Sequence, residues 1–166
     1  KKHSYLLKSL EIDEDDKKLF AQLKTREADE TLVIRSVSLL MRLMETYYGK
    51  PVILLMDEYD VPIAKASSNG YYSQMLSVIR GIMTTALKDN TSLKFAVITG
   101  CLRVAKESIF TGTNNFVSDT INNSGLDEYF GFTQAEVDKI LADADAKEYA
   151  ECMKNWYDGY HFGEFD

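Results

Sequence analysis

Apolar residues follow two patterns along the chain, and the patterns predict two kinds of element. From Glu27 to Tyr48 apolar positions recur at helical spacing, and Gly49 stands where a left-handed residue would end the helix. Pro51 to Met56 and Leu93 to Ile98 are instead almost continuously apolar. Runs of this kind are typical of strands that are buried on both faces of a parallel sheet.

Further helices are predicted on both sides of the second strand. The stretch from Gly70 to Leu87 has one apolar face at helical spacing. Thr133 and Glu136 form a capping box at the start of another helix, and a last helix is expected around Lys147 to Tyr157. The alternation of helices and strands predicts an α/β fold, a parallel sheet flanked by helices with a small helical C-terminal part.

The remaining segments are polar. Residues 11–30 are rich in acids and predict loops with a short exposed helix, whereas residues 111–125 predict a long loop. No apolar stretch approaches the roughly 20 residues of a membrane span, so a membrane is not an expected partner.

The net charge and the cysteine content bear on the expected partners, compartment and metal of the protein. The net charge is −7 and the 19 basic residues are scattered, so we expect no direct contact with nucleic acid, which requires clustered basic residues. Two cysteines, Cys101 and Cys152, fit a reducing compartment and predict a cytoplasmic protein. Neither they nor the two histidines have the spacing of zinc ligands.

Two acids directly follow the first predicted strand. Ligands bind at the carboxyl ends of strands in open α/β sheets, which is where Asp57 and Glu58 would lie. In P-loop ATPases the first such acid orients magnesium through its water shell, and the second polarises the attacking water. The alternative is a pair of solvated acids in a turn, a common arrangement after a strand.

The second predicted strand ends in polar and basic residues. Thr99 follows it directly, with Arg103 and Lys106 a few residues later. An ATPase needs a polar group beside the acids and cations near the terminal phosphate, and these residues would meet both needs. A strand end followed by a solvated basic turn is the alternative.

The sequence contains no phosphate-binding loop. Such a loop requires glycines before a Gly-Lys pair that is followed by Ser or Thr. Gly49-Lys50 precedes Pro51 instead, and Met44 stands where the first glycine would be.

Four blocks of sequence resemble a bacterial AAA-ATPase-like family in order and spacing. They are Asp57 to Pro62, Phe95 to Asn115, Glu128 to Val137, and Trp156 to Gly163. The resemblance covers roughly residues 30–163. It implies a P-loop NTPase sheet of the AAA type, with a phosphate-binding loop upstream and, in most members, a nuclease-like domain downstream. The chain would then be an internal fragment, in which residues 1–132 form a partial α/β domain and residues 133–166 its helical C-terminal segment.

The resemblance also assigns roles to individual residues. It implies that Asp57 is the magnesium-side acid, Glu58 the base and Thr99 the sensor residue, and it places Arg103 and Lys106 in the family's most distinctive block. We therefore predict Glu58, Thr99 and Arg103 as catalytic residues. Asp57 and Lys106 are predicted to bind the cofactor, and Asp57 to hold magnesium through water.

Two further features of these blocks leave alternatives open. Cys101 is interpreted either as a reactive thiol or, in the favoured interpretation, as a small buried residue at a strand end. The aromatic stretch from Trp156 to Tyr160 reads as a docking surface or as a packed helix end.

The function expected from these residues is ATP binding and hydrolysis, or ATP-gated switching, in the intact protein with ATP and magnesium as cofactors. The alternative is a degenerate binding or scaffolding module that has lost turnover. A nuclease using Asp57, Glu58 and Asp60 is disfavoured, because no acid-x-lysine pair follows on a neighbouring strand. The chain alone is expected to be inactive and to bind no cofactor tightly.

A missing strand would have a further consequence. By the resemblance, the strand that carries the phosphate loop pairs with Leu93 to Ile98, and without it the edge at Phe95 and Val97 is unpaired. Unpaired edges recruit other strands, so self-association through this edge is expected unless a segment such as His3 to Leu7 covers it.

Overall fold

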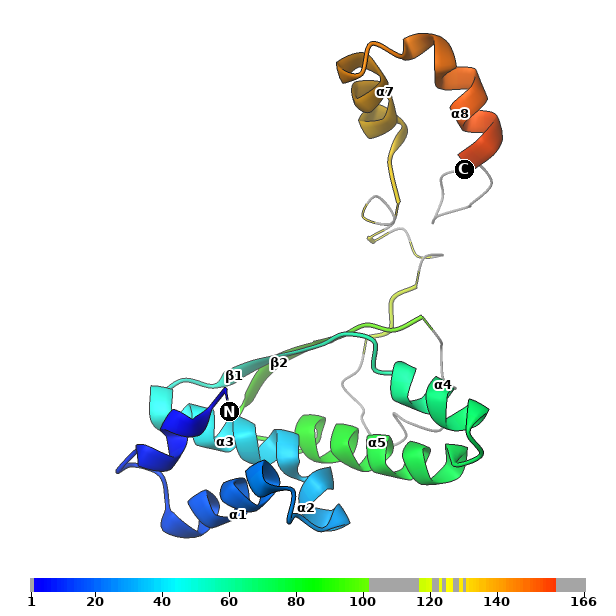
Figure 1. The fold of residues 1–166 in the computed structure, drawn as a ribbon. Coiled ribbons are helices and arrows are strands. Elements are labelled where there is room, and N and C mark those ends of the chain that lie inside the picture. Colours follow the sequence, from blue (N-terminus) through cyan, green and yellow to red (C-terminus); the bar gives the residue numbers. More distant parts are fainter. Residues whose placement is uncertain are drawn as a thin grey trace. The chain divides into compact units, whose positions relative to one another are not determined.

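The computed structural model describes residues 2–101, 117–120, 123, 125–126, 129 and 131–157. The chain divides into two compact units, Lys1–Phe116 and Val117–Asp166 (Figure 1). In the first unit the elements are η1 (Ser4–Lys8), α1 (Glu14–Thr25), α2 (Glu30–Ile34), α3 (Ser36–Tyr48), β1 (Val52–Met56), α4 (Val61–Ser68), α5 (Tyr72–Leu87) and β2 (Leu93–Ile98). This is a mixed α/β arrangement, as the sequence predicts.

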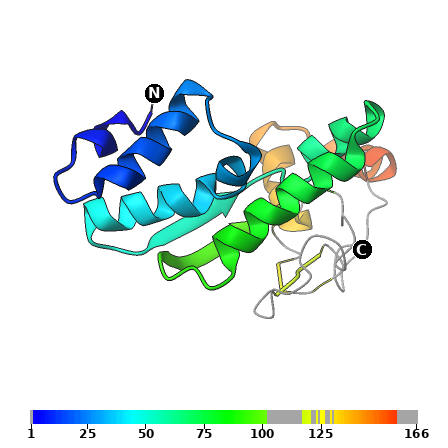
Figure 2. The same cartoon turned by 90° about the horizontal axis from the view of Figure 1, so that it is seen from below.

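β1 and β2 form a parallel pair, and both strands lie where the apolar runs predict them. The register aligns Val52 with Leu93, then Ile53 with Phe95, and continues to Met56 with Ile98. It therefore skips Lys94, which forms a bulge near the start of β2. Helices α3 and α5 pack against one side of this pair, as Figures 1 and 2 show from two directions.

The expectation that both faces of these strands are buried is wrong for the described residues. Side chains alternate along β1 between half-buried and exposed positions, and β2 does the same after its bulge. The face toward α3 and α5 is covered. On the opposite face Ile53, Leu55, Phe95 and Val97 are exposed. A continuous apolar run marks the strand correctly, but it contains no information about whether a second layer is present.

The helix predicted over Glu27 to Tyr48 is two helices. Asp29 caps α2, because its Oδ1 accepts a hydrogen bond from the backbone N–H of Leu32 at 2.7 Å. Arg35 ends α2 and precedes α3, and its backbone angles (φ −88°, ψ 0°) depart from those of a regular helix. The predicted C-terminal cap is confirmed. Gly49 is left-handed at φ 64° and donates its N–H to the carbonyl of Glu45 at 2.7 Å.

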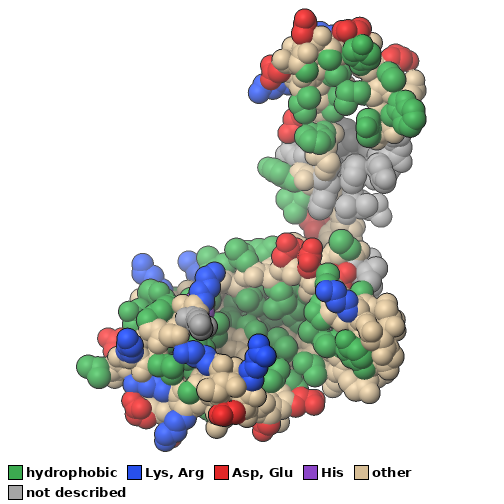
Figure 3. All heavy atoms as spheres, in the orientation of Figure 1, with side chains coloured by type: hydrophobic (Ala, Val, Ile, Leu, Met, Phe, Trp, Pro, Cys, Tyr) green, Lys and Arg blue, Asp and Glu red, His purple; other side chains and the backbone are tan. Residues whose placement is uncertain are grey.

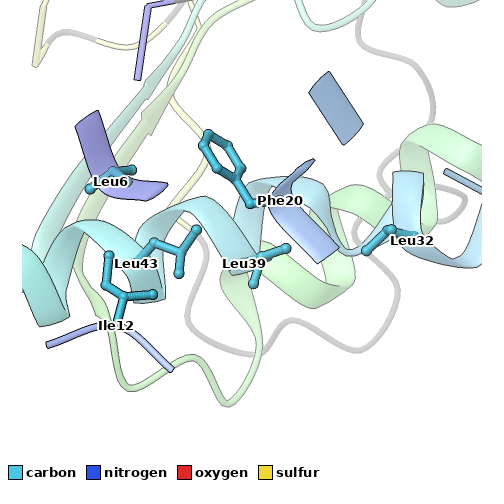
Figure 4. Close-up of a cluster of buried hydrophobic side chains, with 6 residues drawn as sticks. All are labelled: Leu6, Ile12, Phe20, Leu32, Leu39 and Leu43. Carbon is cyan, nitrogen blue, oxygen red and sulfur yellow. The ribbon is translucent and has the colours of Figure 1, made fainter. Parts of the chain in front are cut away.

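The N-terminal segment contributes more to the core than its acidic composition indicates. α1 is twelve residues long rather than a short exposed helix, and Phe20 is buried. His3 to Leu7 is not a strand, because Ser4–Lys8 forms a 3₁₀ helix whose Leu6 is fully buried. These elements pack on α2 and α3 in one cluster of buried side chains, drawn in Figure 4: Leu6, Ile12, Phe20, Leu32, Leu39 and Leu43.

A second apolar cluster joins the sheet to α4 and α5. Ile63 of α4 and Met83 of α5 are its most buried members, and Met56 and Ile98 from the ends of the two strands pack against them. α4 was not expected from periodicity. Its signal is local, since Asp60 precedes the helix and Pro62 stands in the first turn, where proline is favoured. This cluster fixes the strand ends relative to α4.

The C-terminal unit contains α7 (Gln134–Asp143), η3 (Lys147–Tyr149) and α8 (Ala150–Tyr157). The predicted capping box is confirmed: Thr133 accepts from the N–H of Glu136, and Glu136 accepts from the N–H of Thr133 at 2.9 Å. The hydrogen bonds to Thr133 lower the pKa of Glu136. Trp156 and Tyr157 are exposed. That this unit belongs to the same domain as the sheet, with a boundary at residue 132, stays a prediction.

None of the helices in the described part of the chain is both long enough and apolar enough to cross a bilayer.

The core cluster around α3 provides a direct test of the fold. Leu43 is 1% exposed at its centre, and replacing it by Ala should lower the free energy of unfolding by about 2–5 kcal/mol. Leu10 is 99% exposed, so Leu10→Ala should change that free energy by less than about 0.5 kcal/mol. Urea unfolding followed by circular dichroism measures both. Equal effects of the two substitutions would contradict this core.

Candidate functional site

The candidate site lies at the carboxyl ends of the two parallel strands. Asp57 and Glu58 directly follow β1, and Thr99 directly follows β2. Because the strands are parallel and Met56 is aligned with Ile98, both strands end at the same edge of the sheet. All three side chains are exposed there.

Backbone hydrogen bonds continue the pairing beyond the last strand residues. The N–H of Thr99 donates to the carbonyl of Met56 at 2.9 Å, and the N–H of Tyr59 donates to the carbonyl of Thr99 at 3.2 Å. These two bonds hold the segment that carries the acids beside the end of β2. The position of Asp57 relative to Thr99 is therefore set by the main chain.

The side chains of Asp57 and Thr99 are in direct contact. The hydroxyl of Thr99 donates a hydrogen bond to Oδ1 of Asp57. Two residues 42 positions apart in the sequence are thus joined at the edge where the sequence predicts a ligand. The second carboxylate oxygen of Asp57 has no hydrogen bond described in this part of the chain.

Glu58 has an unusual backbone. Its φ is 55°, in the left-handed region that side chains with a Cβ adopt at a cost of about 1–2 kcal/mol per residue. Its carbonyl accepts a hydrogen bond from the N–H of Val61 at 3.1 Å, which begins the turn into α4. A non-glycine residue held in this conformation at a ligand-binding edge is a feature associated with functional sites.

Tyr59 and Gly100, beside the site, were not singled out by the sequence, and Asp60 was named only as an acid of the disfavoured nuclease. Asp60 is 3% exposed, an unusual degree of burial for a carboxylate, and it precedes α4. A Cβ built on Gly100 would lie 2.6 Å from Oδ1 of Asp60 and 2.6 Å from the ring of Tyr59. Only glycine fits at this position, directly after Thr99. The local signal was present in the Asp60 and Pro62 pair, which marks a helix start, and in the glycine at the strand end.

The structure brings together three of the five predicted site residues. Asp57, Glu58 and Thr99 share one edge, whereas Arg103 and Lys106 lie outside the described residues. Their roles in catalysis and cofactor binding stay predictions. The interpretation of Cys101 as a buried residue is wrong, because Cys101 is exposed; Cys101 and Cys152 are both free thiols.

The atoms at this edge are compatible with a hard cation such as magnesium. Magnesium binds through one or two carboxylates, retains several waters, and takes further ligands from phosphates. Asp57 and Thr99 supply a carboxylate and a hydroxyl oxygen of this kind. Within the described residues no group of three or more His, Cys, Asp or Glu side chains could hold a metal ion by itself. The edge therefore fits a water-mediated ion shared with a phosphate, and not a metal site closed by protein ligands.

A cleft of about 610 Å³ lies elsewhere, beside the amino end of β2. Its lining comes from α1, α2, α3 and the turn between α5 and β2, and includes Arg35, Arg42 and Ser92. Arg42 is paired with Asp16. Of the predicted site residues that the structure describes, Asp57, Glu58 and Thr99 do not line this cleft. The chemistry at the strand ends is accordingly assigned from the side chains themselves and not from the shape of a cavity.

The segment that contains both strand ends matches a known family of proteins. Residues 4–110 match the sequence model of a family described as "Predicted AAA-ATPase", and this segment includes β1, β2, Asp57, Glu58 and Thr99. A protein of Azotobacter chroococcum mcd 1, described as "Uncharacterized protein in vnfD 5'region", is 26% identical over 115 residues. The match covers 69% of this chain and 22% of that relative. No solved structure matches the chain.

The left-handed backbone of Glu58 predicts that glycine would be more stable than glutamate at this position. Glu58→Gly should raise the free energy of unfolding by about 0.5–1 kcal/mol, because relief at φ 55° exceeds the entropy that glycine loses on folding. Glu58→Ala retains the Cβ and should give no such gain. Urea unfolding of both variants beside the wild type measures the difference. If glycine destabilises the chain as much as alanine does, the backbone at this residue is not strained.

Proposed function

This chain belongs to the AAA-ATPase-like family, and we propose that it supplies the magnesium-side and water-activating half of an ATP site. One observation carries the proposal. The hydroxyl of Thr99 contacts the carboxylate of Asp57 across the ends of two parallel strands, with Glu58 exposed beside them. Acids after one strand and a polar residue after its neighbour are what nucleotide hydrolysis at a sheet edge requires.

Asp57 would act through its oxygen atoms. The hydrogen bond from Thr99 fixes one carboxylate oxygen, so that the other can accept a hydrogen bond from a water in the ion's shell. When bound, magnesium draws charge from the phosphate oxygens to which it is coordinated. The role of the chain's own residues would be to orient that water shell. The backbone hydrogen bonds donated by Thr99 and Tyr59 hold the segment that carries Asp57 in place.

Glu58 would act as the base. Its side chain is exposed and follows Asp57 directly, and its left-handed backbone gives it a different direction from that of an extended residue at the same position. A carboxylate within hydrogen-bond reach of a water can take its proton as the water attacks. Thr99 lies at the end of the neighbouring strand, where it can help to orient the same water. Arg103 and Lys106 are proposed to face the terminal phosphate.

The other half of the site must come from outside this sequence. No phosphate-binding loop is present in the chain, and most contacts to a triphosphate are made by the backbone amides and the lysine of such a loop. The chain spans about a fifth of the length of the relative that it matches. ATP hydrolysis is therefore proposed for a longer protein that contains this segment together with the loop.

The isolated chain should not bind ATP tightly. Titration calorimetry with magnesium-ATP is expected to show no binding with a dissociation constant below the millimolar range, because the amides that would hold the phosphates are absent. A dissociation constant on the order of 1 μM, about 8 kcal/mol of binding free energy, would contradict this division of the site.

In a longer protein that carries the phosphate-binding loop, Glu58→Gln should reduce ATP hydrolysis at least about 100-fold and leave ATP affinity nearly unchanged. The amide keeps the size of the side chain but cannot accept a proton. Asp57→Asn should instead weaken magnesium-dependent ATP binding. Glu27→Gln, on the polar segment before α2, is the matched control and should change neither quantity.

The outcome also separates hydrolysis from the alternative of a degenerate binding or scaffolding module. If the wild-type longer protein binds ATP but releases no phosphate, the module has lost turnover. If both variants hydrolyse ATP at the wild-type rate, the acids at the strand end are structural.

A further inference from the structure

Asp60 is a buried carboxylate that the proposed chemistry does not use. Acidic side chains reach the surface of the N-terminal unit near the end of β1, where Asp57 and Glu58 are exposed (Figure 3). Asp60, three residues after Asp57, is only 3% exposed. Removing a carboxylate from water costs free energy, so its burial beside a ligand site indicates a role that offsets this cost. Residues of this chain alone bury it, and the role should therefore lie in the contacts at this edge.

The start of α4 does not account for the burial of Asp60. The residue occupies the N-cap position, where an aspartate side chain commonly accepts a hydrogen bond from the first helical turn. No such capping bond is present in α4, whose residues are all described. The helix begins instead with Pro62 in its first turn, and Ile63, 2% exposed, fixes it to α5 and to the strand ends. α4 therefore has its own support, without the carboxylate.

The carboxylate of Asp60 lies against Gly100, the residue that follows Thr99. A Cβ built on Gly100 would be 2.6 Å from Oδ1 of Asp60, and 2.6 and 2.7 Å from two carbon atoms of the Tyr59 ring. Distances this short are collisions, so the two side chains already occupy the space beside Gly100. Two consecutive residues of the turn after β1 thus close on the backbone at the end of β2.

The main chain of the same turn holds Thr99. The N–H of Tyr59 donates to the carbonyl of Thr99 at 3.2 Å, and the N–H of Thr99 donates to the carbonyl of Met56 at 2.9 Å. Both polar groups of the Thr99 backbone are therefore engaged, and the contacts at Gly100 restrain the next residue. The hydroxyl of Thr99, which donates to Oδ1 of Asp57, is left little freedom to move away from the acid.

We propose that Asp60 is a positioning residue of the ATP site, which acts through Gly100 on Thr99. Together with the Tyr59 ring, its carboxylate limits the movement of the backbone at Gly100 and keeps the Thr99 hydroxyl on Asp57. This inference rests on the proposed function, because the position of Thr99 matters to the rate only if the site hydrolyses ATP. Misplacement of a reacting group by about 1 Å can cost about 100-fold in rate. Packed residues behind a site supply the precision that this requires.

The burial of Asp60 argues against a direct catalytic role. A base or an ion ligand must reach water or a metal, and at this edge Asp57 and Glu58 are exposed whereas Asp60 is not. Within the part of the chain that the structure describes, no three His, Cys, Asp or Glu side chains could hold a metal ion together. Asp60 therefore completes no such site with the two exposed acids. Its contribution is expected in the geometry of Thr99, and not in charge at the reacting atoms.

Substitutions of Asp60 in a longer protein that carries the phosphate-binding loop test this role. Asp60→Ala should lower kcat for ATP hydrolysis about tenfold and change KM for magnesium-ATP by less than about twofold, because the phosphate contacts remain. Asp60→Asn keeps the size of the side chain and an acceptor oxygen, and should retain at least about a third of the wild-type kcat. Glu58→Gln, an equally conservative change at the base, should lose at least about 100-fold.

Gly100→Ala tests the same contact from the opposite strand. Gly100 does not have a positive φ, so its backbone accepts alanine and the effect comes from collision with Asp60 and Tyr59. This variant should lower kcat at least about tenfold. Adding Asp60→Ala to it should cause little further loss, because residues that act through one contact have non-additive effects. Gly125→Ala is the matched control and should leave kcat unchanged, since its Cβ would meet Oδ2 of Asp119 at an ordinary 3.6 Å.

Amide hydrogen exchange in the full 166-residue chain separates positioning from general stability and requires no ATP. Asp60→Ala should speed exchange of the Thr99 and Tyr59 amides at least about fivefold, because these amides donate the bonds that join the two strand ends. The amide of Leu43, in the separate core cluster, should exchange as it does in the wild type. If Asp60→Ala does not fold, the same comparison with Gly100→Ala decides.

Faster exchange confined to the strand ends, together with rescue of kcat by asparagine, supports the proposal. Equal losses of kcat in Asp60→Ala and Asp60→Asn would mean that the charge itself is needed, and would overturn it. Unchanged exchange at Thr99, or equal acceleration at Leu43, would overturn it as well. A wild-type longer protein that binds ATP but releases no phosphate refutes the proposed function instead, and the exchange measurement then decides alone whether Asp60 positions Thr99.

Discussion

The parallel pairing of β1 with β2 is the interaction on which the N-terminal unit and its candidate site both depend. A parallel pair places the carboxyl ends of both strands at one edge, so Asp57 and Thr99, far apart in the sequence, are brought within hydrogen-bonding distance. The pairing also fixes which side chains face α3 and α5. Met56 and Ile98, the last residues of the two strands, join the apolar cluster with α4 and α5, so the site rests on packed side chains directly beneath it.

The elements that the sequence predicted best are those whose signals are local. Both strands, the cap at Gly49 and the capping box at Thr133 are each determined by a few adjacent residues. The features that the sequence predicted wrongly depend on tertiary contacts. The break at Arg35 lies within an uninterrupted helical pattern. Helix α1 begins with three acids, yet it presents Phe20 to a core built from four other segments. Composition predicts exposure on average and cannot locate the one buried side chain.

The candidate site likewise combines features that local sequence predicts with features that depend on tertiary contacts. Asp57, Glu58 and Thr99 were found because acids and polar residues after apolar strands are visible in one dimension. To predict that these residues lie together, it was enough to assume that the two strands are neighbours. The burial of Asp60 and the closeness of Asp60 and Tyr59 to Gly100 could not be recognised in this way, since they arise from close packing of a carboxylate and a ring against a position where a Cβ would collide with both. Steric exclusion of this kind has no periodic signature, and it emerges only when the strand ends are built beside α4.

The bulge at Lys94 has a consequence for how such a sheet changes over generations. Lys94 is the extra residue between Leu93 and Phe95, so its deletion would leave Phe95 to Ile98 paired with β1 and facing as they do now. The same deletion between Phe95 and Ile98 would instead put the residues on one side of it onto the opposite face of the sheet. The amino end of β2 is therefore the place where the length of the strand can change by one residue without changing which side chains meet the helices.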